Sequence, residues 1–239
     1  MTIVNQDDDP LYKDYWQSYY EKNKRKGVSI ELARRDVRRK TTLIGALLVE
    51  NGDADGMICG TFSHYQLHLD YVQSVVGKKE GVSDFYAMNA VLMQDRNIFI
   101  ADTYIHEDPT AEQLAEMTVL AAEQLRRFGI TPRVALVSHS SFGTSDRASA
   151  VKMRKAFQLL TDMKVDFEFD GEMQGDAALN EHIRLEDFPS TNFKGAANLL
   201  ILPTLDASNI AFNLLKTATN SASIGPILLG TNKPIHILT

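Results

Sequence analysis

The residues best suited to chemistry form a loop rich in hydroxyl groups that follows a short apolar run, Val134–Val137. The loop carries Ser138, Ser140, Ser141, Gly143, Thr144 and Ser145. Hydroxyl groups, and backbone amides that a glycine allows to turn toward an anion, are typical of a phosphate site between a strand and a helix. The loop therefore indicates a site for phosphate or a phosphorylated cofactor. The alternative is an ordinary connection whose Ser and Thr side chains cap the next helix.

A second polar segment contains three carboxylates, Asp170, Glu172 and Asp176, interleaved with two glycines. It follows an expected strand over Val165–Phe169. Metal binding or acid/base catalysis is one interpretation of such a cluster, and helix capping by Asp170 or Asp176 is the other. The segment by itself does not decide between them.

Two patterns resemble metal sites, but each lacks a glutamate that the site requires. Asn51–Gly56 imitates the start of a calcium loop, but Phe62 stands at the twelfth position, where a glutamate is required. His64 and His68 have the spacing of zinc ligands on a helix, but Tyr65 stands where a metalloprotease has glutamate. We therefore predict a tight turn at the first pattern and solvated or capping histidines at the second, and we assign no metal ligand and no catalytic residue.

Residues 22–40 contain nine basic side chains against two acidic ones. Such a patch suits the phosphates of a nucleotide-like cofactor or an acidic partner surface, and the alternative is a solvated helical face. The preceding helix carries more aromatic side chains than one face can bury, which suggests an interface with another chain or segment. These are Tyr12, Tyr15, Trp16, Tyr19 and Tyr20.

The elements of the first third are mostly helical. Asp9 and Pro10 have the types expected at a helix start, and Gly27 ends that helix. Ser29 caps a second helix. The remaining expected elements are a helix from Thr41 or Thr42 to Leu48, a strand Met57–Cys59, a helix His64–Val76, and strands Phe85–Met93 and Asn97–Ala101.

Helices and strands then alternate. Thr110 and Gln113 form a capping-box pattern at the start of a helix that ends at Gly129. The other expected elements are strand Val134–Val137, helix Ser149–Thr161, strand Val165–Phe169, helix Asp176–His182, strand Leu199–Leu202, helix Ala207–Thr217, and strands Pro226–Leu229 and Pro234–Ile237. This alternation predicts an α/β protein with a largely parallel sheet and ligands at the carboxyl ends of its strands.

The composition excludes several classes of protein. The 25 Lys and Arg against 31 Asp and Glu give a net charge of −6, so any nucleic-acid surface has to be local. Cys59 is the single cysteine and cannot form an internal disulfide. No apolar run approaches the ~20 residues that span a bilayer, and the polar N-terminus is unlike a signal peptide. We expect a soluble, cytoplasmic protein without membrane or nucleic-acid partners.

Five ordered segments together resemble the phosphate acetyl/butyryltransferase family. They are residues 52–60, 132–138, 170–179, 198–209 and 224–230. Within that family, residues 99–104 and 233–239 are most similar to the C-terminal domain of the large bacterial NADP-dependent malic enzymes. The resemblance implies a two-lobed, three-layer α/β/α fold of the isocitrate/isopropylmalate dehydrogenase-like type. Lobe 1 would comprise residues 1–82, truncated and completed by 233–239, and lobe 2 residues 83–232.

The same resemblance implies a ligand and partners. A cleft that binds coenzyme A thioesters in the transferases would here bind acetyl-CoA as an allosteric effector. The contacts it implies are Ser138, Ser140, Ser141, Gly143, Ser145, Asn209 and Thr239, with Arg25 and Lys233 for phosphates. The parent would use NADP with Mg or Mn outside this chain, oxidise malate to pyruvate with decarboxylation, and assemble as a homo-oligomer.

Departures from the family pattern argue against acyl transfer. The transferases have a Ser-Arg pair where Thr239 ends this chain, and two cleft arginines whose places fall near Asn23 and Asp70. An arginine-to-aspartate change removes bidentate donors for phosphate. The leading hypothesis is thus a regulatory module without transferase activity. The alternatives are an active phosphate acetyltransferase, which forms acetyl phosphate and CoA from acetyl-CoA and phosphate, and a purely structural assembly domain.

Overall fold

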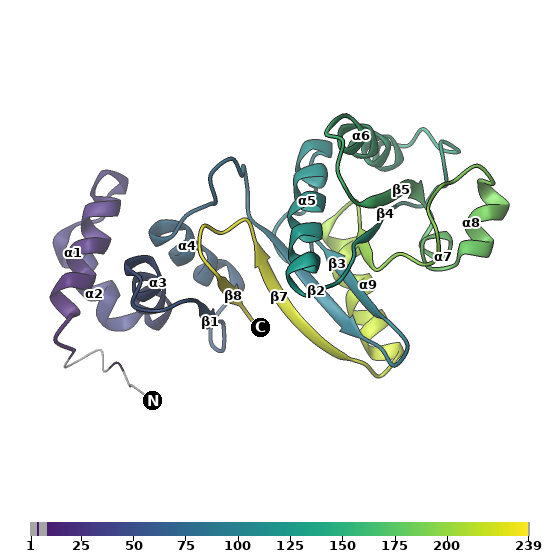
Figure 1. The fold of residues 1–239 in the computed structure, drawn as a ribbon. Helices are drawn as coiled ribbons and strands as arrows, with labels where there is room; N and C mark the ends of the chain where they lie inside the picture. The colour runs from purple at the N-terminus through teal and green to yellow at the C-terminus, as the bar shows by residue number, and fades with distance from the viewer. Residues whose placement is uncertain (1–3, 5–8, 239) are drawn as a thin grey trace. The chain divides into compact units, whose positions relative to one another are not determined.

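The computed structural model describes residue 4 and residues 9–238. The chain divides into two compact units, Met1–Gly81 with Thr231–Thr239, and Val82–Gly230 (Figure 1). Each unit is described by itself.

The first unit is built from helices around one apolar helix. Its elements are α1 (Tyr12–Asn23), a 3-10 turn (Lys24–Lys26), α2 (Ile30–Arg39), α3 (Thr41–Asn51), β1 (Met57–Cys59), α4 (Tyr65–Val75) and β8 (Ile235–Ile237). The α3 helix forms the core because it buries residues on most of its circumference, including Leu43, Leu47 and Val49. Strands β1 and β8 pair in parallel, with Met57 opposite Ile235.

The ends of these helices follow local signals. Ser29 caps α2 by accepting a hydrogen bond from the Leu32 amide, as expected. Gly52 ends α3 in a left-handed conformation with φ 86°, so Asn51–Gly56 is the tight turn that the sequence indicates. The start of α1 was predicted too early, because the Asp9 carboxylate accepts from the Leu11 amide in a turn that precedes the helix.

The second unit is a six-stranded sheet with helices on both faces (Figure 1). Its elements are β2 (Tyr86–Leu92), β3 (Asn97–Ala101), α5 (Ala111–Arg127), β4 (Arg133–Val137), α6 (Ala148–Asp162), β5 (Glu168–Met173), α7 (Gly175–Leu179), α8 (Glu181–Asp187), β6 (Leu199–Ile201), α9 (Leu205–Ala218) and β7 (Ala222–Leu229). The strand order is β5-β4-β6-β3-β2-β7. The first four strands are parallel, whereas β2 is antiparallel to β3 and β7. The predicted α/β fold with a mostly parallel sheet is confirmed.

Alternate side chains of the strands enter two separate cores. Leu136 and Ile201 pack with α5 and α6 on one face, while Ala135 and Leu200 pack with α7 and α9 on the other. Both faces are covered, which is why these strands are almost continuously apolar. The capping box at Thr110 and Gln113 begins α5, as the sequence predicts.

The residue limits predicted for two elements of this unit were wrong. The predicted strand Val165–Phe169 lies at Glu168–Met173, because pairing with β4 places Arg133 opposite Glu168 and Val137 opposite Met173. The predicted helix Asp176–His182 is two helices, because the Asn180 side chain accepts from the His182 amide and starts α8. No helix of the described residues is long and apolar enough to cross a membrane.

Candidate functional site

The carboxyl ends of β5, β4, β6 and β3 lie along one edge of the parallel part of the sheet. The chain leaves β4 toward α6, which packs in the core on one face, and leaves β6 toward α9, which packs in the core on the other. Ligands of open α/β sheets bind where neighbouring connections diverge in this way. The edge between β4 and β6, with the 138–145 loop on one side, is therefore the candidate site.

The 138–145 loop is built around a carboxylate of the protein itself. Glu172 of β5 is fully buried, and its Oε1 accepts three hydrogen bonds. The donors are the Ser140 hydroxyl at 3.1 Å, the Gly143 amide at 3.0 Å and the Arg154 guanidinium at 2.8 Å. The Phe142 amide also donates to the Glu172 carbonyl at 2.7 Å. Two of the groups that the sequence assigns to a bound anion, the Ser140 hydroxyl and the Gly143 amide, thus donate to the Glu172 carboxylate of the protein itself.

Arg154 links this carboxylate to the far end of the loop. From α6, its guanidinium also donates to the Ser145 carbonyl at 2.8 Å and to Asp146 at 3.3 Å. A charge-assisted bond between Arg154 and a buried carboxylate is stronger than a neutral one. The loop keeps its shape because Glu172 fixes its middle and Arg154 fixes its far end.

Ser138 and Ser141 have different surroundings within the same loop. Ser141 Oγ accepts from the Gln174 amide at 3.4 Å. Ser138 is buried, and its hydroxyl has no hydrogen-bond partner among the described residues, as is also true of Glu172 Oε2. Buried polar atoms are usually paired, so an unpaired hydroxyl at a sheet edge is a candidate contact for a ligand.

Ser145 pairs with a histidine in a geometry that resembles a nucleophile and its base. Its hydroxyl lies 3.1 Å from His139 Nε2, and the other ring nitrogen lies 3.4 Å from Ser149 Oγ. Nucleophilic catalysis also uses a group, often a carboxylate, that orients the histidine. Within the described part of the chain, no carboxylate bonds to His139. The pair by itself does not form a catalytic triad.

The other predicted contacts are distributed over both units. Asn209 lies in the second turn of α9, and its side-chain amide donates to the Thr103 carbonyl at 3.1 Å, which ties α9 to the segment that follows β3. Arg25 and Lys233 are exposed side chains of the first unit. Thr239 lies outside the described residues. Within the second unit, the structure brings the predicted residues of the 138–145 loop together at one edge of the sheet.

The two positions compared with transferase arginines have structural roles here. Asn23 is buried, and its amide donates to the Tyr19 and Ser74 carbonyls, both at 3.0 Å, which joins α1 to α4. Asp70 is exposed and accepts from Gln66. The prediction of a solvated or capping histidine was wrong for His68, because it lies buried within α4, with its Nδ1 2.7 Å from Thr42 Oγ1.

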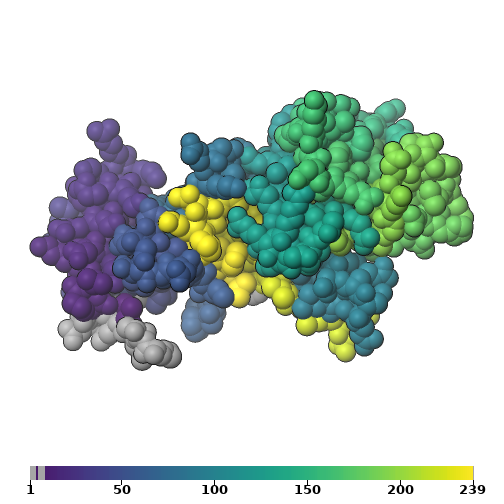
Figure 2. All heavy atoms as spheres, in the orientation of Figure 1, coloured from purple at the N-terminus to yellow at the C-terminus, as the bar shows by residue number. Residues whose placement is uncertain are grey.

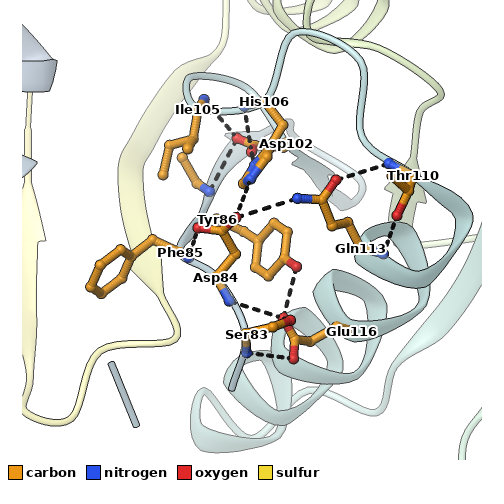
Figure 3. Close-up of polar contacts among 11 residues, drawn as sticks. Ser83, Asp84, Phe85, Tyr86, Asp102, Ile105, His106, Thr110, Gln113 and Glu116 are labelled. Atoms are coloured by element: carbon orange, nitrogen blue, oxygen red, sulfur yellow. Dashed lines mark hydrogen bonds and ion pairs between the residues drawn. The ribbon is translucent and has the colours of Figure 1, made fainter. Parts of the chain in front are cut away.

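A second, partly buried polar cluster connects the segment after β3 with the start of β2 and with α5, and the sequence patterns do not reveal it (Figure 3). Its centre is His106, whose Nδ1 lies 3.0 Å from Asp102 and whose Nε2 lies 2.9 Å from Asp84. A neutral imidazole has one N–H, so both contacts are hydrogen bonds only when the ring is protonated. Burial alone lowers the pKa of His106, but the hydrogen bonds and charges of Asp102 and Asp84 outweigh it, and the pKa is raised above 6.5.

The carboxylates of this cluster organise the backbone around them. Asp102 accepts from the amides of Ala87, Tyr104, Ile105 and His106. Glu116 of α5 accepts from the Ser83 hydroxyl and amide and from the Tyr86 hydroxyl at 2.8 Å (Figure 3). These bonds lower the pKa of Glu116 despite its partial burial, which by itself raises it. The cluster fastens the loop after β3 to the sheet.

Glu172, Arg154 and His106 could not be found from motifs. Glu172 was noticed in the sequence but assigned to a loop after a strand, whereas it lies within β5. Arg154 lies on a helix whose apolar face gives no sign of a buried partner. The only signal for His106 is a polar segment at the carboxyl end of a strand, where functional residues tend to gather.

Comparison with known proteins gives a consistent result. Residues 1–239 match the family model described as phosphate acetyl/butaryl transferase. The chain is 49% identical over 238 residues to an NADP-dependent malic enzyme of Salmonella typhimurium, which covers 99% of this chain and 31% of that protein. It is 31% identical over 237 residues to a phosphate acetyltransferase of Synechocystis, which covers 99% of this chain and 34% of that protein. A phosphotransacetylase from Streptococcus pyogenes has the same fold, with a TM-score of 0.92 and 30% identity over 100% of this chain and 72% of that one.

Proposed function

Because this chain belongs to the phosphate acetyl/butaryl transferase family, we propose that it is the phosphotransacetylase-like regulatory region of a malic enzyme and that it binds acetyl-CoA. The carrying observation is the 49% identity to a malic enzyme across 99% of the chain, against 31% identity to a phosphate acetyltransferase. The chain spans only 31% of that malic enzyme. Malate oxidation, NADP, Mg or Mn, and assembly into a homo-oligomer are therefore parts of the same proposal, assigned to the longer protein.

The site supports binding more than chemistry. Its loop is fixed by the bond between Glu172 and Arg154, and the donors of Ser140 and Gly143 are already used there. These two residues act as positioning residues for the loop. The proposed ligand contacts in this loop are therefore Ser138, whose hydroxyl has no partner among the described residues, and Ser141 and Ser145 at the same edge of the sheet. Hydroxyls without an oriented base can hold a phosphate or thioester oxygen but do not attack it.

Regulation requires that acetyl-CoA bind two states of the enzyme with different affinities. Ligand at the edge between β4 and β6 would favour one of these states and so change malate turnover. Arg25 and Lys233 of the first unit are the proposed phosphate contacts from that unit. Asn209 and Thr239 complete the proposed set.

Calorimetric titration of the intact malic enzyme with acetyl-CoA tests the proposal, together with malate-dependent NADP reduction in the same buffer. We expect saturable binding and a change in malate turnover. The Ser138→Ala variant should bind at least fivefold more weakly at unchanged thermal stability, because its hydroxyl has no partner among the described residues to leave unpaired. Ser190→Ala, at an exposed residue of the same unit, is the matched control.

Two results would contradict the proposal. Absence of binding at millimolar acetyl-CoA would exclude this ligand, and equal affinities of the two serine variants would exclude this loop. A parallel assay for acetyl phosphate formation separates regulation from transferase activity. Turnover of acetyl-CoA and phosphate at this site would replace the regulatory proposal with the enzymatic one.

A further inference from the structure

A cationic cavity lies between α1 and α2 of the first unit; these two helices are coloured purple in Figure 2. It has a volume of about 650 Å³. Its lining includes Tyr12 and Trp16 of α1 and four arginines of α2: Arg34, Arg35, Arg38 and Arg39. Cavities that bind small molecules usually measure about 300–1,000 Å³, so this one is large enough for a ligand.

Aromatic rings hold two of the arginines in place. The Arg34 guanidinium lies 4.4 Å from the centre of the Trp16 ring, and the Arg38 guanidinium lies 4.8 Å from the centre of the Tyr12 ring. The Tyr12 hydroxyl donates to the Arg34 carbonyl at 2.8 Å, which fixes α1 against α2. A stacked guanidinium keeps its N–H groups free in its own plane, so these arginines are positioned to donate before a ligand arrives.

The positive charge of the cavity is poorly compensated. Among the described residues, the only carboxylate within ion-pair distance of the four arginines is Asp36, which Arg35 approaches at 3.4 Å; the exposed Glu31 carboxylate also attracts Arg34 from a greater distance. Arg34 and Arg38, and likewise Arg35 and Arg39, are four residues apart on one helix, where like charges destabilise the helix. Lys13 adds a further cation to the lining. Five cations around one cavity, of which Arg35 alone has a carboxylate within ion-pair distance among the described residues, are the arrangement expected of an anion site.

We propose that this cavity binds a small polyanion with two or more phosphate groups. Arginine binds phosphate oxygens in pairs, and several phosphates are needed to use four guanidinium groups at once. The described residues that line the cavity all belong to α1 and α2, whereas the loop proposed for acetyl-CoA belongs to the other unit. The inference therefore does not depend on the proposed function, and either one can fail alone.

The single tryptophan of the chain gives a direct readout, because Trp16 lines the cavity. The intact chain is titrated with sodium tripolyphosphate while Trp16 fluorescence is followed, with sodium sulfate at matched ionic strength as the reference. We expect a saturable change with one ligand per chain. Arg38→Met should weaken binding at least tenfold, and Arg38→Lys should weaken it less, because the charge remains and the paired donors are lost.

Arg127→Met is the matched control, since Arg127 is an exposed arginine near the end of α5 in the other unit. Circular dichroism establishes that each variant is folded. Absence of a saturable signal up to millimolar tripolyphosphate would overturn the proposal, as would an equal loss in the Arg38→Met and Arg127→Met variants. Binding of a poly-glutamate peptide without binding of tripolyphosphate would overturn it in favour of an acidic protein partner.

Discussion

Replacing Arg154 with methionine should destabilise the second unit more than the loss of an ordinary surface ion pair. Arg154 Nη1 lies 2.8 Å from Glu172 Oε1, and the side chains are 31% and 1% exposed. Methionine keeps much of the aliphatic length but removes the charge and the donors. Glu172 would remain buried, with only Ser140 and Gly143 donating to it.

The geometry bounds the size of the effect. At 2.8 Å, the Coulomb attraction is about 6 kcal/mol for an effective dielectric constant of about 20, and about 1.5 kcal/mol for that of water. Breaking a fully buried pair typically costs about 3–5 kcal/mol, because one charge is left without compensation. Since Arg154 is partly exposed, we expect a loss of about 2–4 kcal/mol. At about 2–4 °C per kcal/mol for a chain of this size, a 3 kcal/mol loss lowers the Tm by about 6–12 °C.

Lys155→Met provides the control on the same helix. Lys155 pairs with Glu112 at 2.6 Å, but their side chains are 60% and 59% exposed, so this loss should stay within about 0.5 kcal/mol. Urea denaturation followed by circular dichroism measures both variants. The double variant Glu172→Gln/Arg154→Met should lose about 1.5–3 kcal/mol less than the sum of its single variants. Equal losses in Arg154→Met and Lys155→Met, or strict additivity in the double variant, would refute the role given to this pair.

Three further predictions concern the second unit. The pKa of His106 is raised above 6.5, so protonation of its ring contributes stability that is complete below pH 6.5 and is lost as pH rises through the folded-state pKa. The free energy of unfolding of the wild type should therefore fall as pH rises above 6.5, and His106→Gln should not show this loss. An equal pH dependence in both proteins would contradict this, and urea denaturation at each pH measures it. Thr110→Ala should cost about 1 kcal/mol by removing the cap of α5, and Thr110→Ser should cost little. Gly171→Ala should lower the free energy of unfolding by more than about 2 kcal/mol. At Gly171 φ is 143°, a conformation that strains alanine, and the added Cβ would lie 2.7 Å from the Leu136 carbonyl oxygen. A Tm near that of the wild type would contradict this prediction.

Features of the fold encoded by neighbouring residues were predictable. The cap at Ser29, the capping box at Thr110 and the left-handed Gly52 each depend on contacts within a few positions of the chain. The alternation of apolar runs and helical faces then indicated the α/β class. No such local rule specifies β5, because its limits are set by parallel pairing with β4 across the sheet. Its Asp-Gly-Glu sequence is typical of a turn, and tertiary pairing overrides that preference.

In the candidate site, too, features encoded by neighbouring residues were predictable, and contacts between distant residues were not. The loop after β4 could be predicted as an anion site, since hydroxyls and a glycine after a buried strand have a local meaning. The Glu172 carboxylate that already accepts hydrogen bonds from this loop could not be predicted, because Ser140 and Glu172 are 32 positions apart and meet only through the register of β4 and β5. His106 is similar, since Asp84 lies 22 positions away and reaches it only when β2 and β3 pair.

The internal carboxylate also constrains how the loop can serve a ligand. A phosphate that took the donors of Ser140 and Gly143 would displace Glu172 from them and leave two anions close together in a buried place, which is costly. Under the proposed function, the ligand phosphate would therefore bind beside the Glu172 carboxylate, through groups such as the Ser138 hydroxyl that Glu172 does not use. A loop whose shape is already set by Glu172 and Arg154 does not need ligand to become ordered. Under the proposed function, a difference in acetyl-CoA affinity between two states would therefore have to come from groups outside this loop.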